Sequence, residues 1–381
     1  MRTVELKIED IAFGGKGVGR DNGKAVFIPF TIDDETVTAD IVREKKQFAE
    51  AELVDIRQAS EHRTAPVCPY FARCGGCAYQ HINYEHQLQI KWRQVRDVLR
   101  RIGKIPEPPI RPIVASPNDY AYRNRITVHV QDGVIGFFRR ESNRLIDIER
   151  CPISMKEVNE GLRELRAANP KDGHYALRAG NGPRIFAQTN DAVAEALRQQ
   201  LISMISPGQD LLIDTYCGSG FFAKALIDKF QRIIGIDWDK FAIAEARKNA
   251  TDKEIYIAGD VEEELTKLLQ LELPPNAGFQ SGIGGSPMFT TPLASGQCHE
   301  RNTSLTVLID PPADGLSAGV LDTMAELRPQ TLIYVSCNPA TLARDLNRLA
   351  GLFSIQSVTP FDMFPQTAEI EVLTHLTLST N

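Results

Sequence analysis

A cysteine near the C-terminal end of the chain occupies a position suited to a nucleophile. Cys337 directly follows an apolar segment, residues 331–336, which is predicted to be a strand, and Asn338-Pro339 then begin a helix. The dipole at a helix N-terminus favours the thiolate, the nucleophilic form of cysteine. A buried, inert cysteine would explain neither the strand end nor the Asn-Pro that follows. The pattern therefore predicts that Cys337 is a catalytic nucleophile.

Two acids lie further along the chain, at the start of another predicted strand that covers residues 370–377. Glu369 and Glu371 are two residues apart, so both side chains would lie on the same face of a strand. One of them could be a base directed into the site of Cys337. The alternative is a pair of exposed charges at a strand edge, and the spacing does not choose between the two acids.

A glycine turn upstream has the features of a cofactor site. The predicted strand 211–214 runs into Tyr216, Gly218 and Gly220, and a helix follows. Such a turn lets backbone N–H groups approach a ligand closely. The next predicted strand, 233–237, ends at Asp237, and an acid at that place can accept hydrogen bonds from a ribose diol.

Acids also follow the third and fourth predicted strands, 255–258 and 305–310. Asp260 comes after Gly259, and Asp310 is followed by two prolines that stiffen the loop. Ligands of open α/β sheets bind at the carboxyl ends of the strands, where these acids lie. The full order fits class I methyltransferases better than NAD enzymes: a single G-x-G, an acid on the second strand, Gly259-Asp260 after the third and Asp310-Pro-Pro after the fourth.

Four cysteines form a second constellation, with the spacing C-x5-C-x2-C and one distant member before a proline. They are Cys68, Cys74, Cys77 and Cys151. Disulfides are not expected in a chain without a secretory signal. Four thiolates with a C-x2-C core suit either zinc or an iron–sulfur cluster, and spacing alone does not choose between them. The remaining alternative is a set of unrelated buried thiols.

The elements that must position these residues follow a clear order. From residue 184 to 381, seven candidate strands occur, and helical segments separate the first six; the last, 355–360 and 370–377, are joined by a short loop. This predicts an α/β fold with a doubly wound sheet. A polar Gly/Ser/Thr/Pro-rich insertion at 275–303 is expected to be a flexible loop.

The first half of the chain is expected to be β-rich. Residues 1–58 contain four or five short strands, which predicts a small barrel, with Gly14, Gly15, Gly17 and Gly19 marking a turn between the first two. Residues 59–183 form a central domain that contains the cysteines, a helix over 84–102 and hairpin strands within 120–150. On the helix an apolar stripe is expected to face the core, and an arginine stripe faces RNA or solvent; the apolar residues are Leu88, Trp92, Val95, Leu99 and Ile102, and the arginines are Arg93, Arg96 and Arg100.

Composition narrows the class of protein. The chain has 381 residues, 43 % of them hydrophobic, and its N-terminal segment carries acids that a secretory signal would lack. No stretch approaches the roughly 20 apolar residues of a membrane span, so we expect a cytoplasmic protein with no membrane association and no obligate protein partner. The net charge is −6, yet residues 91–150 have a local charge of +6, which is either a site for a phosphate backbone or a solvated basic face.

Taken together, these motifs resemble those of a known family over nearly the whole chain. The segment IEDIAFGGKGVGR with KAVFIPF resembles the TRAM domain, an OB-like RNA-binding barrel. The rest resembles the uracil-C5 RNA methyltransferases, class I enzymes that depend on S-adenosylmethionine. The matching pieces are Phe186-Ala-Gln188-Thr-Asn190, the loop 214–220, Asp310-Pro-Pro, Ser336-Cys337-Asn338-Pro339, Thr341-Leu-Ala-Arg-Asp345 and Asp362-Met-Phe-Pro365-x-Thr367-x-x-x-Glu371.

The resemblance implies a role for each motif. Cys337 would be the nucleophile that adds to C6 of a uridine, and Glu371 the base that removes the C5 proton. The four cysteines would hold a 4Fe-4S cluster, with zinc the weaker alternative. Contacts to S-adenosylmethionine or to the base are expected from seven residues: Gln188, Tyr216, Gly218, Gly220, Asp237, Asp260 and Asp310.

The substrate is expected to be ribosomal RNA, most plausibly 23S, because a barrel and a cysteine cluster together resemble ribosomal-RNA enzymes more than bacterial transfer-RNA ones. Transfer RNA is the alternative. Three positions depart from the family pattern: Ala313 replaces Arg, Glu369 replaces His and Asp237 replaces Glu. A catalytically impaired RNA-binding homologue is therefore a second alternative. An amino-methylating or cytosine-C5 enzyme is disfavoured by Asp310-Pro-Pro-Ala313.

Overall fold

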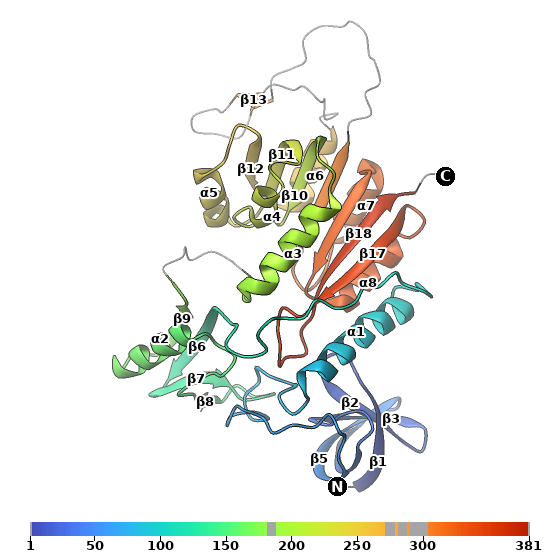
Figure 1. Ribbon diagram of the computed structural model, residues 1–381, viewed down its shortest axis with the longest axis vertical. Helices are drawn as coiled ribbons and strands as arrows, with labels where there is room; N and C mark the ends of the chain where they lie inside the picture. The colour runs from blue at the N-terminus through green and yellow to red at the C-terminus, as the bar shows by residue number, and fades with distance from the viewer. Residues whose placement is uncertain (1, 181–187, 271–278, 281–287, 290–303, 380–381) are drawn as a thin grey trace, which may run out of the picture.

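The computed structural model describes residues 2–180, 188–270, 279–280, 288–289 and 304–379. Its strands form a closed barrel, a four-stranded sheet and a seven-stranded sheet, besides a pair of two-residue strands, β13 (Phe279–Gln280) and β14 (Met288–Phe289). Figure 1 shows the barrel and the four-stranded sheet side by side below the seven-stranded sheet. Within the described residues, no helix is both long and apolar enough to cross a membrane. Apart from β13 and β14, the predicted loop 275–303 lies outside the described residues.

The N-terminal barrel closes in the strand order β1-β2-β3-β5-β4. Its strands are β1 (Arg2–Ile11), β2 (Lys16–Asp21), β3 (Lys24–Pro29), β4 (Thr36–Glu44) and β5 (Phe48–Gln58). The predicted glycine turn is only half right. Gly14 and Gly15 have positive φ and form it, but Gly17 and Gly19 lie inside β2. Gly17 is required there because a Cβ would lie 2.0 Å from Thr31 Oγ1.

The central region contains the long helix α1 (Tyr84–Arg101) and a four-stranded antiparallel sheet in the order β8-β7-β6-β9. Its strands are β6 (Arg125–Gln131), β7 (Val134–Phe138), β8 (Leu145–Asp147) and β9 (Gly173–Arg178). The hairpin strands were expected from the sequence, whereas β9 and the helix α2 (Lys156–Ala167) were not. Val158 and Leu162 of α2 pack on the apolar residues of this sheet.

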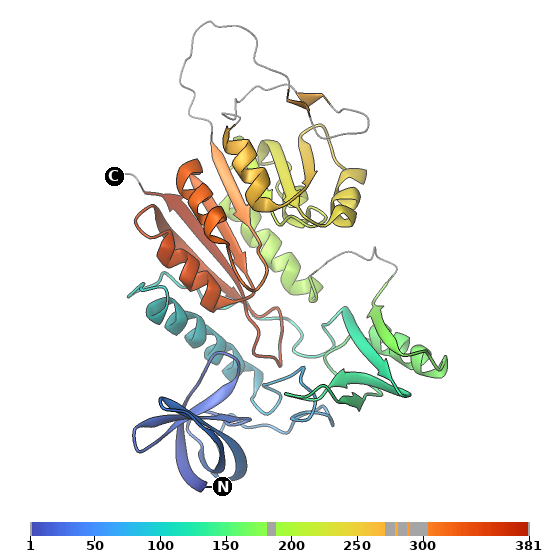
Figure 2. The same ribbon diagram turned by 180° about the vertical axis from the view of Figure 1, so that it is seen from behind.

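Helix α1 is present as predicted, but its buried face differs from the predicted one. Trp92 is half-buried and Ile102 is exposed, while Gln87, Lys91 and Gln94 are buried among apolar neighbours. The shift occurs because α1 packs between the barrel and the seven-stranded sheet (Figure 2), and its buried polar side chains bind backbone groups of both. The arginine stripe is partly used within the protein: the Arg93 guanidinium donates to Asp33 at 2.7 Å, and Arg96 to Asp97 at 3.1 Å.

The seven-stranded sheet has the order β12-β11-β10-β15-β16-β18-β17, and all seven predicted strands are found. They are β10 (Gln209–Thr215), β11 (Phe230–Asp237), β12 (Glu254–Ala258), β15 (Leu305–Ile309), β16 (Thr331–Ser336), β17 (Phe353–Phe361) and β18 (Glu371–Leu378). All pairs are parallel except those of β18, which runs antiparallel to β16 and β17. The chain order reverses between β10 and β15, so their carboxyl ends form the crevice in which ligands of such sheets bind.

Helices cover both faces of this sheet, as a doubly wound fold requires. One apolar core joins it to α6 (Val261–Gln270), α7 (Ala318–Leu327), α8 (Pro339–Arg348) and α1. The other joins it to α3 (Asp191–Met204), α4 (Phe221–Ala225) and α5 (Lys240–Lys248). Alternate residues of each central strand enter the two cores: Ile213 of β10 belongs to the first and Leu212 to the second. The strands are therefore buried on both faces, and only their ends are open for chemistry.

Candidate functional site

Strand pairing brings Cys337 and Glu371 together. In the antiparallel pair of β16 and β18, Ser336 lies opposite Val372. One step further along the same register places Cys337, the first residue beyond β16, opposite Glu371, the first residue of β18. Directly opposed residues of antiparallel strands have neighbouring side chains. Segments 34 residues apart in sequence thus form one site at the carboxyl edge of the sheet.

The two candidate acids have different surroundings. Glu371 is 3 % exposed, whereas Glu369 is exposed on the loop before the strand. Burial raises the pKa of Glu371 well above its usual range, and the negative charges of Asp310 and Glu369 raise it further. A carboxyl group in such surroundings holds a proton readily, which is a property of general bases and acids.

The thiol of Cys337 is not the ready thiolate that its helix position suggested. Burial raises its pKa to about 12, and the charges of Glu371 and Asp310 add to the effect. Burial and the charges of these two acids thus oppose the effect that the helix dipole is expected to have on the thiol. These influences show at the same time that Cys337, Glu371 and Asp310 share one electrostatic environment.

The Asp310 loop is held in place by the helix that follows Cys337. The side chains of Asn338 and Thr341 both donate hydrogen bonds of 3.0 Å to the carbonyl oxygen of Ala313. Further along α8, the buried Asp345 accepts a hydrogen bond of 2.9 Å from the N–H of Leu316. Ala313 stands where the family pattern has arginine, and it makes these contacts because they use only its backbone carbonyl. These are positioning roles that the sequence motif alone did not specify.

The glycine turn after β10 is built around Asp237. The backbone N–H groups of Gly218 and Asp239 each donate a hydrogen bond of 2.8 Å to the Asp237 carboxylate. Gly218 and Gly220 both have positive φ, and a Cβ at Gly220 would lie 2.5 Å from the hydroxyl oxygen of Tyr256. Tyr216 also has positive φ, and burial raises its pKa to about 12. The turn is therefore a tight cradle at the carboxyl edge of the sheet.

The two other predicted cofactor residues, Asp260 and Gln188, lie on separate segments outside the glycine turn. Asp260 is exposed, and its carboxylate accepts a 3.1 Å hydrogen bond from the N–H of Glu263 in the first turn of α6. Gln188 begins the described segment before α3, and its carbonyl accepts a hydrogen bond from Asn124. The neighbouring Phe186 and Ala187 lie outside the described residues.

A buried acid beneath the glycine turn was quoted in the sequence motif but given no role. Asp214 is fully buried, and one of its carboxylate oxygens accepts from the N–H of Ala223 while the other has no partner. Burial raises its pKa well above the usual range. Burial raises the pKa of Asp310 to about 7, and the charge of Asp237 acts in the same direction. This concentration of acids fits a cofactor that carries a positive charge.

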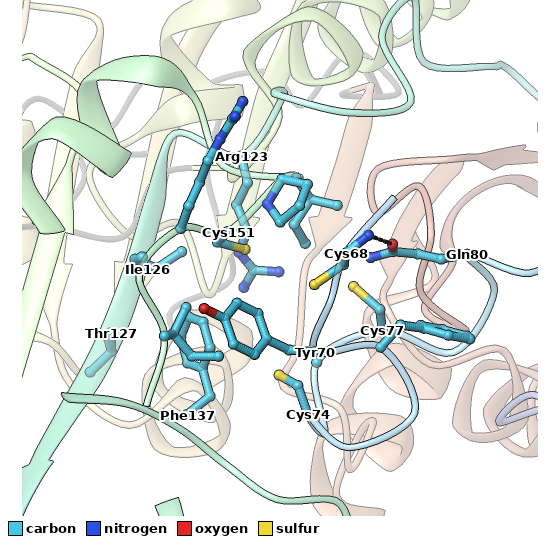
Figure 3. Close-up of a pocket in the computed structure, with 16 residues that line it drawn as sticks. Cys68, Tyr70, Cys74, Cys77, Gln80, Arg123, Ile126, Thr127, Phe137 and Cys151 are labelled. Atoms are coloured by element: carbon cyan, nitrogen blue, oxygen red, sulfur yellow. Dashed lines mark hydrogen bonds between the residues drawn. The ribbon is translucent and has the colours of Figure 1, made fainter. Parts of the chain in front are cut away.

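The four predicted metal ligands meet in one cavity. Cys68, Cys74, Cys77 and Cys151 all line a cavity of about 310 Å³ beside the four-stranded sheet. Figure 3 shows their sulfur atoms gathered beside the Tyr70 ring, with the N–H of Cys68 bonded to Gln80. Cys151 comes from the far side of the sheet, where the Asn159 side chain binds both its N–H and its carbonyl.

The thiols act on one another electrostatically. Burial raises the pKa of Cys77 to about 12, and the charges of the other three cysteines contribute. Yet within the described residues, no three or more His, Cys, Asp or Glu side chains are placed to hold a single metal ion. All four thiols nevertheless belong to the lining of one cavity.

A buried polar network that the sequence did not reveal holds the loop before Glu371. The Lys91 ammonium of α1 donates to Asp362 at 2.6 Å and to the carbonyl of Phe364 at 3.0 Å, and both charged side chains are fully buried. The amide of Gln87 donates to Gln366 at 3.0 Å, and the Gln366 N–H donates back to it. A lysine within the buried face of an otherwise amphipathic helix is the sequence signal that would have pointed to this role.

Family comparisons agree with this geometry. The family model described as tRNA (uracil-5-)-methyltransferase matches residues 170–378, and the TRAM domain model matches residues 1–54. A protein named as an uncharacterized RNA methyltransferase from Bdellovibrio bacteriovorus is 31 % identical over 98 % of this chain and 94 % of its own length. The chain belongs to the tRNA (uracil-5-)-methyltransferase family. Its members' dependence on S-adenosylmethionine fits the acid-lined glycine turn, and its TRAM barrel marks it as an RNA-binding protein.

Other members and a solved structure extend the comparison. A methyltransferase-family relative from Protochlamydia amoebophila is 28 % identical over 98 % of this chain and 97 % of its own. Among solved structures, the Pyrococcus abyssi tRNA (uracil-54, C5)-methyltransferase in complex with S-adenosyl-L-homocysteine matches with a TM-score of 0.69. It is 22 % identical and covers 98 % of this chain and 100 % of its own, so it supports the fold of the whole molecule.

Proposed function

We propose that this family member methylates C5 of a uridine in RNA, with Cys337 as the nucleophile and Glu371 as the base. The observation that carries the proposal is the pairing of Ser336 with Val372, which brings the residues next to Cys337 and the buried Glu371 together. The same edge of the sheet carries Asp310 and the Asp237 turn, to which we assign the cofactor. Gln188, Tyr216, Gly218, Gly220 and Asp260 complete the proposed contacts.

The proposed chemistry explains why a cysteine and a carboxylate are needed together. C5 of uracil is a weak nucleophile, and addition of the Cys337 sulfur to C6 raises electron density at C5. S-Adenosylmethionine supplies an electrophilic methyl group when bound. C5 takes that methyl group, Glu371 removes the C5 proton, and the bond between sulfur and C6 breaks as the ring double bond re-forms. Before the attack the Cys337 proton must leave, and Asp310 and Glu371 are the carboxylates whose charges already act on that thiol.

A trapping experiment tests this scheme. RNA that carries 5-fluorouridine at the target position has no C5 proton to remove, so the wild-type protein should remain covalently attached to it in a cofactor-dependent manner. Cys337→Ala should abolish both the adduct and methylation of ordinary RNA. Normal methylation by the Cys337 variant would overturn the mechanism.

For the RNA substrate we propose ribosomal RNA, most plausibly 23S, with transfer RNA as the second candidate. The support is the combination of a TRAM barrel with four clustered cysteines in one chain. The solved relative named above acts, by its description, on uridine 54 of transfer RNA. Mass spectrometry of both RNA classes from a deletion strain distinguishes the candidates: loss of a 5-methyluridine from transfer RNA alone would refute the ribosomal assignment.

For the cysteine cavity we propose a 4Fe-4S cluster held by Cys68, Cys74, Cys77 and Cys151. The support is that all four thiols line one cavity. The cluster would have a structural role, because methyl transfer requires no electrons. Protein purified without oxygen should contain iron and acid-labile sulfide in equal amounts; stoichiometric zinc without iron would refute the assignment.

We also propose three units, with boundaries at 1–58, 59–183 and 184–381. They correspond to the barrel, the central region with the cysteines, and the methyltransferase sheet with its helices. In this arrangement the barrel and the central region hold RNA while the third unit carries out the chemistry. A cytoplasmic location follows from the RNA substrate and belongs to the same proposal.

A further inference from the structure

The four-stranded central sheet has one covered face and one open face. Along β6, Ile126, Val128 and Val130 are buried against the apolar core shared with α2. The intervening residues Thr127 and Gln131 are exposed, as strict alternation requires. The open face therefore presents one row of side chains from each strand, and their chemistry defines what the face can bind.

Three aromatic rings from three strands meet on this face. His129 of β6 lies opposite His174 of β9, with ring centroids 4.6 Å apart and their Nδ1 atoms at 2.6 Å. On its other side, His129 lies 4.3 Å from the ring of Phe138 at the end of β7, which is 39 % exposed. Burial lowers the pKa of His129, and the charge of His174 acts in the same direction. The result is a surface cluster of three rings, in which the planes of His129 and His174 are 86° apart and those of His129 and Phe138 are 42° apart.

Two arginines extend the same face toward the methyltransferase sheet. Arg125 and Arg178 are directly paired in the register of β6 and β9, four residues from the histidine pair and on the same side. Burial lowers the pKa of Arg125, and the positive charges of Arg178 and Arg123 contribute, which shows that positive charge is concentrated here. The adjoining Asn124 binds the Gln188 carbonyl and Asp191, so this end of the face reaches the segment that carries a proposed pocket residue.

We propose that this open face binds a single-stranded segment of the RNA substrate next to the target uridine, with bases stacked on Phe138, His129 and His174. The inference rests on the proposed function only in taking RNA as the substrate. Stacking on aromatic rings accepts any base, and paired bases in a duplex cannot reach such rings. Arg125 and Arg178 supply the positive charge that a phosphate backbone requires, along the path toward the proposed site.

The test measures binding rather than catalysis. A fluorescent single-stranded RNA of mixed sequence, and the same strand annealed to its complement, are titrated with the full-length protein and followed by anisotropy. Phe138→Ala with His174→Ala should weaken binding of the single strand by about 5- to 100-fold, the range for lost base stacking. The duplex should lose much less affinity. Gln131→Ala is the matched control, because it lies on the same face, on the strand between those of Phe138 and His174, and carries no ring.

A conservative variant distinguishes a stacking role of the His174 ring from a role in holding the sheet together. His174→Phe removes the bond between the histidines but keeps a flat ring, and it should bind the single strand within about twofold of wild type. Single-strand affinity unchanged in the alanine variants, or lost equally for strand and duplex, would overturn the proposal. Because the assay needs no methyl transfer, a wild-type protein that binds as expected but does not methylate uridine would count against the proposed function alone. In the methylation assay the alanine variants should raise KM for RNA and leave kcat near that of wild type.

Discussion

Buried carboxyl groups dominate the carboxyl edge of the seven-stranded sheet. Burial raises the pKa values of Asp214, Asp310 and Glu371, and the charges of neighbouring acids raise them further. Such a concentration of negative charge is unfavourable without a cation. In the proposed function the sulfonium of S-adenosylmethionine supplies that cation, and its binding favours ionisation of these acids.

The choice of base can be tested at the level of single residues. Glu371→Gln should allow addition and methyl transfer but block removal of the C5 proton, so a methylated RNA–protein adduct should accumulate on denaturing gels. Glu369→Gln is the matched control and should turn over near the wild-type rate, because that side chain is exposed. A stalled Glu369 variant beside an active Glu371 variant would show that the assignment is reversed.

Cofactor affinity should depend on pH through Asp310. Its pKa is raised to about 7 in the protein alone, and a bound sulfonium stabilises the ionised form. Affinity for S-adenosylmethionine should therefore rise with pH up to about 7, by at most about tenfold per pH unit, and level off above. S-Adenosylhomocysteine, which lacks the positive charge, should show a smaller change in calorimetry at the same pH values. Asp310→Asn should remove the difference; an unchanged difference would exclude Asp310 as the coupled group.

At the scale of the elements, helix α1 connects distant parts of the fold through its polar side chains. It joins the barrel, through Arg93 and Gln94, to the loop that precedes Glu371, through Gln87 and Lys91. Gln366 in that loop has a positive φ of 69°, a conformation that the surrounding hydrogen bonds must maintain. The helix thus holds the loop that leads to Glu371, the proposed base, although the two segments are far apart in sequence.

The buried pair of Lys91 and Asp362 should be costly to break on one side only. Lys91→Met leaves a buried carboxylate without its partner and should lower the free energy of unfolding by about 3–5 kcal/mol. Adding Asp362→Leu should recover much of that loss, since two apolar residues replace two charges. Lys156→Met, which breaks an exposed pair with Glu160, is the control and should leave the urea midpoint unchanged. Equal stability of the Lys91 single variant and wild type would show that the pair is unimportant.

At the scale of the whole molecule, the cysteine cavity and the proposed catalytic loop are in direct contact. The N–H groups of Ala78 and Tyr79, which follow Cys77 immediately, both donate to the carbonyl of Gln366, at 3.0 and 2.9 Å. Figures 1 and 2 show that this loop descends from the seven-stranded sheet toward the central region. These hydrogen bonds connect the segment after Cys77 to the loop that leads to Glu371.

Loss of the cysteine ligands should impair turnover without affecting the cofactor. Cys74→Ala should lower kcat, because the segment that binds Gln366 loses its anchor, while affinity for S-adenosylmethionine stays unchanged, because the Asp237 turn lies on other elements. Kinetics and calorimetry on the same preparation provide both readouts. A parallel loss of cofactor affinity would indicate general unfolding instead of a local effect.

Much of the site could be predicted from local sequence patterns. A few neighbouring residues determine where a strand ends and which turn follows. The positions of Asp237, Asp310 and Cys337 at the carboxyl edge of the sheet could therefore be predicted. The spacing of the four cysteines likewise predicted a common site, and all four line one cavity. The seven strands of the methyltransferase sheet were predicted for the same reason, because periodicity is a local signal.

Other features were decided only by tertiary structure. The spacing of Glu369 and Glu371 did not choose between them, and only the fold shows that Glu371 is buried whereas Glu369 is exposed. The fold also surrounds the Cys337 thiol with acids whose charges raise its pKa. The strand β9 brought His174 to His129. In each case the physical cause is the same: burial, strand register and the Coulomb field of neighbouring groups depend on segments distant in the chain, and no local pattern of residues contains that information.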